Sequence, residues 1–256
     1  MMRKPLVVLL SIFLSACSVS PSTPPSVEKI TLKPLGTSTS VPSPTSTEVP
    51  STIPPEPTTD PGFFRDDFAG TLKPQWNWIR EDPKNWSLTT LPGSLQINVG
   101  GGYVAANTNF NMLMRPAPAG NFQIETQISF NPEDNFQFAG LIMYESPADF
   151  IQAGRGYCRS SECVGEGLYM NYYKKGVAVK PDFGQTYKDA KPILLRLSRE
   201  GKNYTFEAST DGKVWFLVGS HASDMDPLQV GLVTGQRLKG GTLPAAFDYF
   251  EIRSLP

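Results

Sequence analysis

The stretch Phe122-Gln123-Ile124-Glu125-Thr126-Gln127-Ile128-Ser129-Phe130 decides the fold class, because apolar and polar residues alternate along it without interruption. A period of two residues is typical of a β-strand that buries one face and exposes the other. On the polar face of this strand the only acidic residue is Glu125, which is followed at the next same-face positions by Gln127 and Ser129. The stretch is therefore predicted to be a strand with one buried face.

Other short apolar segments on either side of this strand carry the same kind of signal. They cover residues 140–144, 167–173, 193–197, 204–208 and 214–218. The last two flank Asp211-Gly212, a dipeptide that favours the tight turn of a hairpin. No window of about a dozen residues shows a helical period. Many short strands separated by turns predict an all-β domain, built as an antiparallel sandwich or barrel.

The composition changes abruptly near residue 62, and this change divides the chain. Residues 18–61 contain no aromatic residue and consist mainly of Pro, Ser and Thr, so they are predicted to be a disordered tether. Residues 62–256 are rich in aromatic side chains and are long enough to form one independent core. The formal net charge of −1 argues against a nucleic-acid partner, which would require a basic surface.

Residues 1–17 have the layout of a secretory signal. Arg3 and Lys4 precede an apolar run over residues 6–14, and small residues lead to Cys17. The tetrad Leu14-Ser15-Ala16-Cys17 resembles the bacterial lipobox, in which the cysteine is lipidated. We therefore expect an extracytoplasmic protein that is lipid-anchored to the bacterial cell envelope, with the membrane as partner through its N-terminal lipid. An ordinary signal peptide with a chance cysteine is the alternative.

Several separated blocks within residues 62–256 carry a family resemblance. They are Phe64-Arg65-Asp66-Asp67-Phe68, Leu72-Lys73-Pro74-Gln75-Trp76, Trp78-Ile79-Arg80-Glu81-Asp82-Pro83, Trp86-Ser87-Leu88, Pro92-Gly93-Ser94-Leu95, Phe136-Gln137-Phe138-Ala139-Gly140-Leu141 and Phe247-Asp248-Tyr249-Phe250. In this order they resemble the concanavalin A-like module at the C-terminus of family 43 β-xylosidases. The resemblance implies a jelly-roll sandwich of two curved antiparallel sheets with a concave face. It does not imply catalysis, because this fold hosts lectins, binding modules, hydrolases and lyases.

Sugar recognition on such a face combines aromatic rings, which stack on pyranose rings, with polar groups for the hydroxyls. The predicted carbohydrate-binding residues are Trp78, Trp86, Glu125, Tyr144, Arg155, Tyr157, Tyr169 and Asn171. Tyr173 and Trp215 are further aromatic candidates. If the strand over residues 168–173 buries Leu168, it turns Tyr169 and Asn171 to the other face. The alternative for each aromatic residue is core packing or a scattered surface position.

No catalytic residue is predicted. The single histidine, His221, has no nucleophile motif nearby and is expected at the surface or at a strand end. A glycosidase requires two facing carboxylates, and Glu125 could form such a pair only across strands, with Glu145 or Glu166.

The prediction is a surface-anchored, monomeric carbohydrate-binding module for a polysaccharide or oligosaccharide. A glycoside hydrolase or polysaccharide lyase is the first alternative, and a structural or adhesion domain is the second.

The resemblance also implies a structural calcium ion, which ties the first strand to the last in related sandwiches. The residues that match this pattern by position are Asp66, Asp67, the carbonyl of Gly93, and Asp248. Carboxylates and carbonyls are the hard oxygen ligands that calcium prefers. The alternative is that the two adjacent aspartates cap a turn and Asp248 faces solvent.

Cys158 and Cys163 remain once Cys17 is lipidated, and outside the cytoplasm they are expected to form a disulfide. Metal binding is the weaker alternative, because the sequence offers no further Cys or His ligand at this loop. We expect the disulfide to shape a loop at the rim of the concave face.

Overall fold

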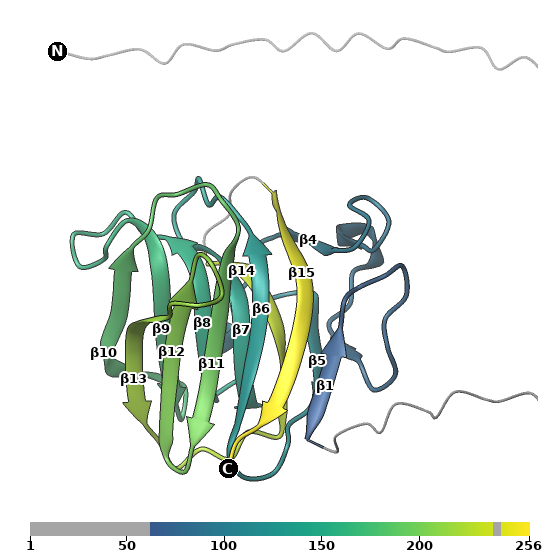
Figure 1. The fold of residues 1–256 in the computed structure, drawn as a ribbon. Helices are drawn as coiled ribbons and strands as arrows, with labels where there is room; N and C mark the ends of the chain where they lie inside the picture. The colour runs from purple at the N-terminus through teal and green to yellow at the C-terminus, as the bar shows by residue number, and fades with distance from the viewer. Residues whose placement is uncertain (1–61, 238–241) are drawn as a thin grey trace, which may run out of the picture. The chain divides into compact units, whose positions relative to one another are not determined.

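The structure, a computed structural model, describes residues 62–237 and 242–256. The predicted signal peptide, the lipidation site Cys17 and the tether over residues 18–61 lie outside the described residues. Within them the all-β prediction is confirmed, because two antiparallel sheets pack face to face as a sandwich (Figure 1). The helical segments described are two 3-10 turns, η1 (Pro83–Asn85) and η2 (Val104–Ala106). None of the described helical segments has the length and hydropathy needed to span a membrane.

One sheet has eight strands and forms the front layer of Figure 1. Its order is β13 (Phe216–Ala222), β12 (Asn203–Ser209), β11 (Ile193–Glu200), β6 (Phe122–Ser129), β15 (Leu243–Ser254), β4 (Leu95–Val99) and β3 (Trp86–Ser87), and β1 (Phe63–Asp66) pairs with β15. The predicted strand at residues 122–130 is thus confirmed as β6, and it lies in the middle of this sheet. The predicted hairpin at Asp211-Gly212 is also confirmed, since β12 and β13 pair across it.

The second sheet has seven strands. Its order is β10 (Val177–Thr186), β9 (Glu166–Lys174), β8 (Asp149–Tyr157), β7 (Gln137–Ser146), β14 (Gln229–Gln236), β5 (Met112–Pro116) and β2 (Asn77–Ile79). The central strands β7, β8 and β9 are long and pair along most of their length, and they form the floor on which the candidate site is built.

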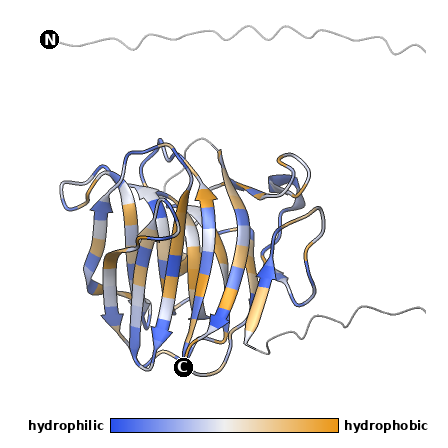
Figure 2. Ribbon diagram, in the orientation of Figure 1, coloured by the Kyte–Doolittle hydropathy of each residue, from blue (hydrophilic) through white to orange (hydrophobic). Residues whose placement is uncertain are grey.

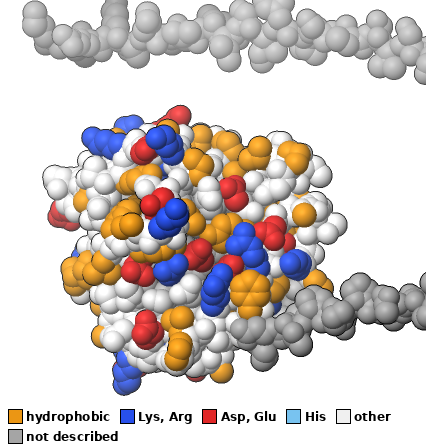
Figure 3. Space-filling model, in the orientation of Figure 1, with side chains coloured by type: hydrophobic (Ala, Val, Ile, Leu, Met, Phe, Trp, Pro, Cys, Tyr) orange, Lys and Arg blue, Asp and Glu red, His pale blue; other side chains and the backbone are white. Residues whose placement is uncertain are grey.

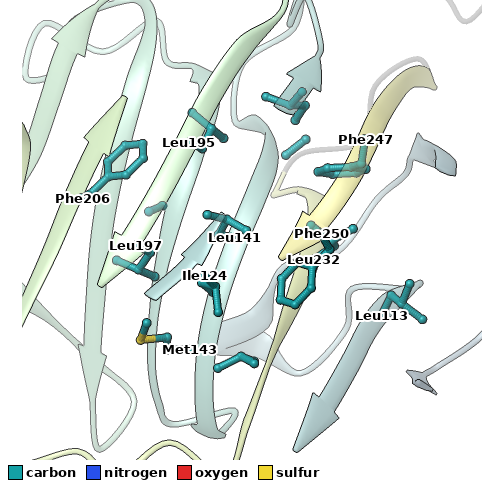
Figure 4. Packing of buried hydrophobic residues seen from close by; sticks show 14 of the residues in the cluster. Leu113, Ile124, Leu141, Met143, Leu195, Leu197, Phe206, Leu232, Phe247 and Phe250 are labelled. Atoms are coloured by element: carbon teal, nitrogen blue, oxygen red, sulfur yellow. The ribbon is translucent and has the colours of Figure 1, made fainter. Parts of the chain in front are cut away.

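The core lies between the two sheets and follows from the alternation along the strands, which is visible as alternating colours in Figure 2. Figure 4 shows side chains from both sheets pointing toward one another across this space. The labelled residues are Leu113, Ile124, Leu141, Met143, Leu195, Leu197, Phe206, Leu232, Phe247 and Phe250. Full burial of each such side chain stabilises the fold by about 1.5–3 kcal/mol before the entropy cost is counted.

A second, smaller apolar cluster covers part of the opposite, outer face of the seven-stranded sheet. Its buried members are Val104, Met112, Met114, Ile142, Phe150 and Val233. Val104 belongs to η2, so the segment around η2 lies over this face of the sheet and keeps water from these side chains. The rest of the outer face, over β7 to β10, carries a pocket.

Candidate carbohydrate-binding pocket

A pocket of about 470 Å³ is hollowed into the outer face of the seven-stranded sheet. A volume of this order is typical of a small-ligand site. Strands β7 to β10 supply most of its wall, and η2, the loop after β8 and the end of β14 close its sides. Its lining residues include Tyr103, Phe136, Phe138, Gln152, Gly156, Tyr157, Cys158, Glu162, Cys163, Tyr169, Asn171, Tyr173, Lys180, Asp182, Phe183, Gly184 and Arg237.

The alternation along β9 decides which of its side chains reach the pocket. Leu168, Met170 and Tyr172 are buried in the core between the sheets. Tyr169, Asn171 and Tyr173 therefore emerge on the other face, where all three line the pocket. This outcome confirms the predicted orientation of the strand.

Gly156 lines the pocket beside two aromatic rings. A Cβ atom at this position would lie 3.3 Å from the Phe138 ring and 3.5 Å from the Tyr169 ring, and 2.9 Å from the carbonyl oxygen of Gln137. A side chain at position 156 would therefore crowd both rings, and glycine leaves their edges uncovered.

The aromatic rings of the pocket are held in fixed orientations. The Tyr169 hydroxyl donates a hydrogen bond to the carbonyl oxygen of Gly165, and burial raises the pKa of this phenol. Tyr173 stacks on Phe150 with ring centroids 4.8 Å apart and an interplanar angle of 11°. Burial also raises the pKa of Tyr173, so both rings stay neutral at physiological pH. Rigid neutral rings of this kind can stack on a sugar at a small entropic cost.

Two amides lie side by side on the pocket floor. Gln152 and Asn171 are cross-strand partners on β8 and β9, and Gln152 Nε2 lies 3.4 Å from Asn171 Oδ1 as a donor. This contact uses one group of each amide, and within the described part of the chain no hydrogen bond engages the Gln152 oxygen or the Asn171 nitrogen, which can therefore pair with ligand hydroxyls. A planar amide beside an aromatic ring is the combination that sugar hydroxyls and sugar faces require.

A disulfide-closed loop forms one rim of the pocket, and the predicted bond between Cys158 and Cys163 is present. Both cysteines and the intervening Glu162 line the pocket. The loop is fixed at its base by the Arg159 amide, which donates to Asn135 Oδ1 at 2.8 Å. The predicted disulfide is therefore confirmed, and the loop that it closes lines the pocket on the outer face of the seven-stranded sheet.

Charged groups from two different elements line the pocket. Lys180 forms an ion pair with Asp182, and both lie where the β10 register shifts between Val179 and Phe183. The guanidinium of Arg237, which follows β14, lies over the rings of Tyr103 and Phe136.

The structure brings together three of the predicted sugar-binding residues, Tyr157, Tyr169 and Asn171. Tyr144 lies on the same face of the sheet, in a cross-strand row with Phe150 and Tyr173, but it packs on the second apolar cluster outside the pocket.

The two predicted tryptophans lie elsewhere. Trp78 and Trp86 pack on each other with centroids 4.8 Å apart and lie against the main core at β2 and β3. Neither is among the residues that line the pocket. For both tryptophans the alternative given for the aromatic residues, packing against the core, is therefore what the structure shows.

Glu125 was predicted to be a polar partner on the same face as the aromatic residues, and this is wrong. Glu125 belongs to β6 of the other sheet and points to that sheet's outer face. Its carboxylate binds Arg196 at 2.9 Å and accepts a hydrogen bond from the Tyr249 hydroxyl at 2.7 Å. Figure 3, which views this face, shows Lys and Arg side chains intermixed with acidic ones. Glu125 is engaged in a surface ion-pair network and lies on a different sheet from the pocket.

The prediction for Arg155 is also wrong, because its side chain is 0% exposed. Arg155 has the same strand parity as Ile151 and Ala153, so it points between the sheets. Its guanidinium binds Glu166 Oε1 at 2.7 Å and lies 5.3 Å from the centre of the Tyr187 ring. A ligand in the pocket cannot reach it.

The two cross-strand carboxylate pairs that the sequence left open for catalysis are not formed. Glu125 lies on β6 of one sheet, whereas Glu145 and Glu166 lie on strands of the other sheet, so no cross-strand pair links them. The residues directly opposite Glu125 are Arg196 on β11 and Glu251 on β15, and Glu251 binds Arg65 at 2.9 Å. The carboxylates that do share the pocket are Glu162 and Asp182.

His221 lies near the end of β13 as predicted, but it is buried rather than at the surface. It packs edge-on against Tyr172 and Phe183, and burial lowers its pKa. It is therefore a core histidine at the junction of the two sheets.

Asp66, the first of the predicted calcium ligands, does not fit a cation in this arrangement. Its carboxylate accepts hydrogen bonds from the Phe68 amide at 3.0 Å, the Lys73 amide at 2.9 Å and Trp76 Nε1 at 2.8 Å. N–H groups that point at both oxygens present positive charge where a cation would bind. The pattern matches the turn-capping alternative at this position.

The remaining predicted ligands also have partners. Asp67 pairs with Arg65 at 2.7 Å, and Asp248 accepts a hydrogen bond from the Ser94 hydroxyl at 3.0 Å, next to Gly93. Within the described ranges no three acidic, His or Cys side chains cluster as metal ligands. Calcium binding by Asp248 and the Gly93 carbonyl stays a prediction.

Several pocket residues were missed by the sequence analysis. The alternation along β7 and β8 places the side chains of Phe138 and Gln152 on the pocket face. Both residues could therefore have been predicted if these two strands had been recognised at their full length. Lys180 and Asp182 lie at a bulge on an irregular edge strand, and Arg237 follows β14 in a bend. No periodic pattern marks these three residues.

Comparisons with known proteins place the chain in a family. Residues 65–253 match the family described as the β-xylosidase C-terminal concanavalin A-like domain. A xylan 1,3-β-xylosidase from a Vibrio species is 24% identical over 217 residues, which is 73% of this chain and 37% of the relative. This chain therefore spans less than half of that relative's length.

Solved structures show the same fold. The GH43 protein BlXynB of Bacillus licheniformis has a TM-score of 0.67 and 21% identity over 77% of this chain and 40% of its own. A Bacteroides ovatus GH43B protein, described as part of a xyloglucan utilisation locus, has a TM-score of 0.66 and 22% identity over 75% of this chain and 39% of its own. The Bacillus licheniformis β-glucanase has a TM-score of 0.55 and 11% identity, over 76% of this chain and 99% of its own. The chain belongs to the family of β-xylosidase C-terminal concanavalin A-like domains.

Proposed function

We propose that this protein binds a polysaccharide or oligosaccharide in the pocket on the seven-stranded sheet and does not itself cleave it. The observation that carries the proposal is the Gln152–Asn171 amide pair, which lines one pocket together with the Tyr169 and Tyr173 rings. Fixed rings offer a stacking surface for a pyranose, and the amides offer partners for its hydroxyls.

The ligand that we propose is a plant-type polysaccharide such as xylan. The names of two relatives support this choice, because one is a xylan 1,3-β-xylosidase and another belongs to a xyloglucan locus. Those proteins are more than twice as long as the stretch that matches here, so their activities are not carried over to this chain.

The experiment is a binding assay of the purified protein on a glycan array and on insoluble polysaccharides, with pocket variants beside the wild type. Tyr169→Ala removes a stacking ring, and Asn171→Ala removes an amide. Each is expected to weaken binding about tenfold, which corresponds to about 1.4 kcal/mol. Trp215→Ala is the matched control, since this ring lies over Arg196 on the other sheet. Equal binding by all four proteins would refute the site, and no binding to any glycan would favour the structural or adhesion alternative.

A second candidate function is hydrolysis of the bound glycan, because Glu162 and Asp182 line the same pocket. Two carboxylates beside a sugar are the minimum for acid–base cleavage. The Lys180–Asp182 ion pair argues against this role, because it engages the Asp182 carboxylate, one of the two that hydrolysis would need. Incubation with any glycan that binds, followed by an assay for new reducing ends or unsaturated products, separates the two functions. If the wild type forms such a product and Glu162→Gln does not, the protein is an enzyme that uses Glu162.

We also propose that a lipid on Cys17 anchors the protein to the bacterial cell envelope. The lipobox-like tetrad supports this proposal, and each acyl methylene buried in a membrane contributes about 0.8 kcal/mol. Labelled palmitate fed to expressing cells should be incorporated into the wild type and recovered in the membrane fraction. Cys17→Ala should lose both the label and the membrane association, and unchanged membrane recovery would contradict the proposal.

A further inference from the structure

We propose that the pocket selects glycans that carry a carboxylate, and that Arg237 is the residue that binds it; this inference rests on the proposed glycan-binding function. The ligand class is therefore a polysaccharide that contains uronic acid residues. Arg237 is the specificity-determining residue, whereas Tyr169 and Asn171 bind features that every pyranose shares.

Arg237 is positioned as a preformed anion-binding group at the pocket wall. Its side chain is exposed, and its guanidinium carbon lies 5.5 Å from the centre of the Tyr103 ring and 5.6 Å from that of Phe136. These two rings limit the motion of the side chain, so less entropy is lost when a ligand binds. The planar fork of donors matches a carboxylate in a bidentate geometry.

Arg237 also differs from Lys180, the other cation that lines the pocket, because no acidic partner binds it among the residues that the structure describes. Lys180 is held by Asp182 and also lies within electrostatic reach of Glu162. None of the ion pairs within residues 62–237 and 242–256 includes Arg237. Within that part of the chain Arg237 is therefore a lining cation whose charge is available to a ligand.

The charges of the lining residues favour one placement of an acidic sugar. Arg237 lies over Tyr103 and Phe136, whereas the acidic lining residues Asp182 and Glu162 come from β10 and from the loop after β8. A ligand carboxylate at Arg237 is attracted, whereas a carboxylate at Asp182 or Glu162 meets a like charge that repels it.

The test uses matched pairs of glycans that differ only in the carboxylate. Glucuronoxylan, polygalacturonate and alginate are each compared with their carboxyl-reduced forms by affinity electrophoresis or calorimetry. The wild-type protein should bind at least one acidic form about tenfold more tightly than its reduced form, and added salt should narrow this ratio. In Arg237→Gln the ratio of the two affinities should be close to one, and binding to the reduced form should not be weakened. Arg237→Lys keeps the positive charge and should keep part of the preference for the acidic form.

Arg253→Gln is the matched control, because Arg253 is an exposed arginine on the outer face of the other sheet. This variant should keep the wild-type ratio. If the wild type binds acidic and reduced forms equally, or if Arg237→Gln weakens both forms by the same factor, the inference is overturned while the glycan-binding function stands. If no form of any glycan binds, the proposed function fails and the inference fails with it.

Discussion

At the scale of single residues, the Asp66 carboxylate organises the start of the domain through three N–H donors, from Phe68, Lys73 and Trp76. Asp66 is buried, and its strand β1 pairs with β15. The Trp76 ring in turn packs on Phe250 with centroids 5.0 Å apart. One carboxylate therefore ties a loop, an aromatic ring and the last strand together.

Asp66→Asn tests this role. The amide can accept at only one of its two positions, and its NH₂ group would face an N–H donor, so the loss of stability is expected to be about 3 kcal/mol in urea unfolding. The loss should be the same with calcium or with EDTA present, because the partners are N–H groups. Destabilisation that appears only with calcium present would instead show that Asp66 is a metal ligand.

A second residue-scale prediction concerns the ion pair between the buried Arg155 and the partly exposed Glu166. Glu166→Gln leaves a guanidinium that is 0% exposed without a carboxylate partner. The expected destabilisation is about 3–5 kcal/mol, whereas the double variant Arg155→Met with Glu166→Gln should recover most of it. Urea unfolding of the two single variants and the double variant forms a double-mutant cycle. Additive losses would show that the two side chains are not coupled.

At the scale of elements, strands with one buried face were predictable, whereas the exposed edge strand β10 was not. The alternation in residues 122–130 and 168–173 predicts β6 and β9 and the faces of their side chains, because burial on one side imposes the period. Strand β10 has no such pattern, since it is mostly exposed and contains Pro181 and a bulge. An edge strand tolerates both features.

The site was only partly predictable for a related reason. Strand parity places Tyr169 and Asn171 on one face, but which sheet a strand joins depends on pairing between distant segments. Glu125 was misplaced because nothing local assigns β6 to one sheet and β9 to the other. Arg155 was misplaced because a charged residue at a core parity position is uncommon, and the Glu166 partner that makes it possible comes from the next strand.

The disulfide-closed loop gives the element-scale prediction. Replacing Cys158 and Cys163 together by Ser should cost about 2 kcal/mol of stability, as expected for a short closed loop. It should also weaken glycan binding, because both cysteines and Glu162 line the pocket. The affinity for the glycan identified on the array is measured by calorimetry for the wild type and for the double variant, at a temperature where both proteins are folded. Unchanged affinity would show that the rim does not contribute to the site.

At the scale of the whole molecule, the two sheets meet beside the pocket through β10 and β13. The Phe183 ring lies over Gly219, where a Cβ atom would approach it to 2.4 Å, and its centroid is 4.9 Å from that of His221. Phe183 also lines the pocket. The packing that joins the sheets at this edge therefore also forms one wall of the binding site.

This junction makes the stability of the fold depend on pH through His221. Burial lowers its pKa below the ordinary value of 6.5, an effect that the nearby Asp182 carboxylate partly offsets. Among the described residues Nε2 has no hydrogen-bond partner, so a proton there would be poorly solvated. Below about pH 6.5 the unfolded chain binds a proton that the folded chain does not, so the free energy of unfolding falls as the pH falls. Urea unfolding between about pH 7.5 and 5 should show this decline, with a slope of at most about 1.4 kcal/mol per pH unit. His221→Gln should flatten it, and an equal decline in the variant would assign the effect to other groups.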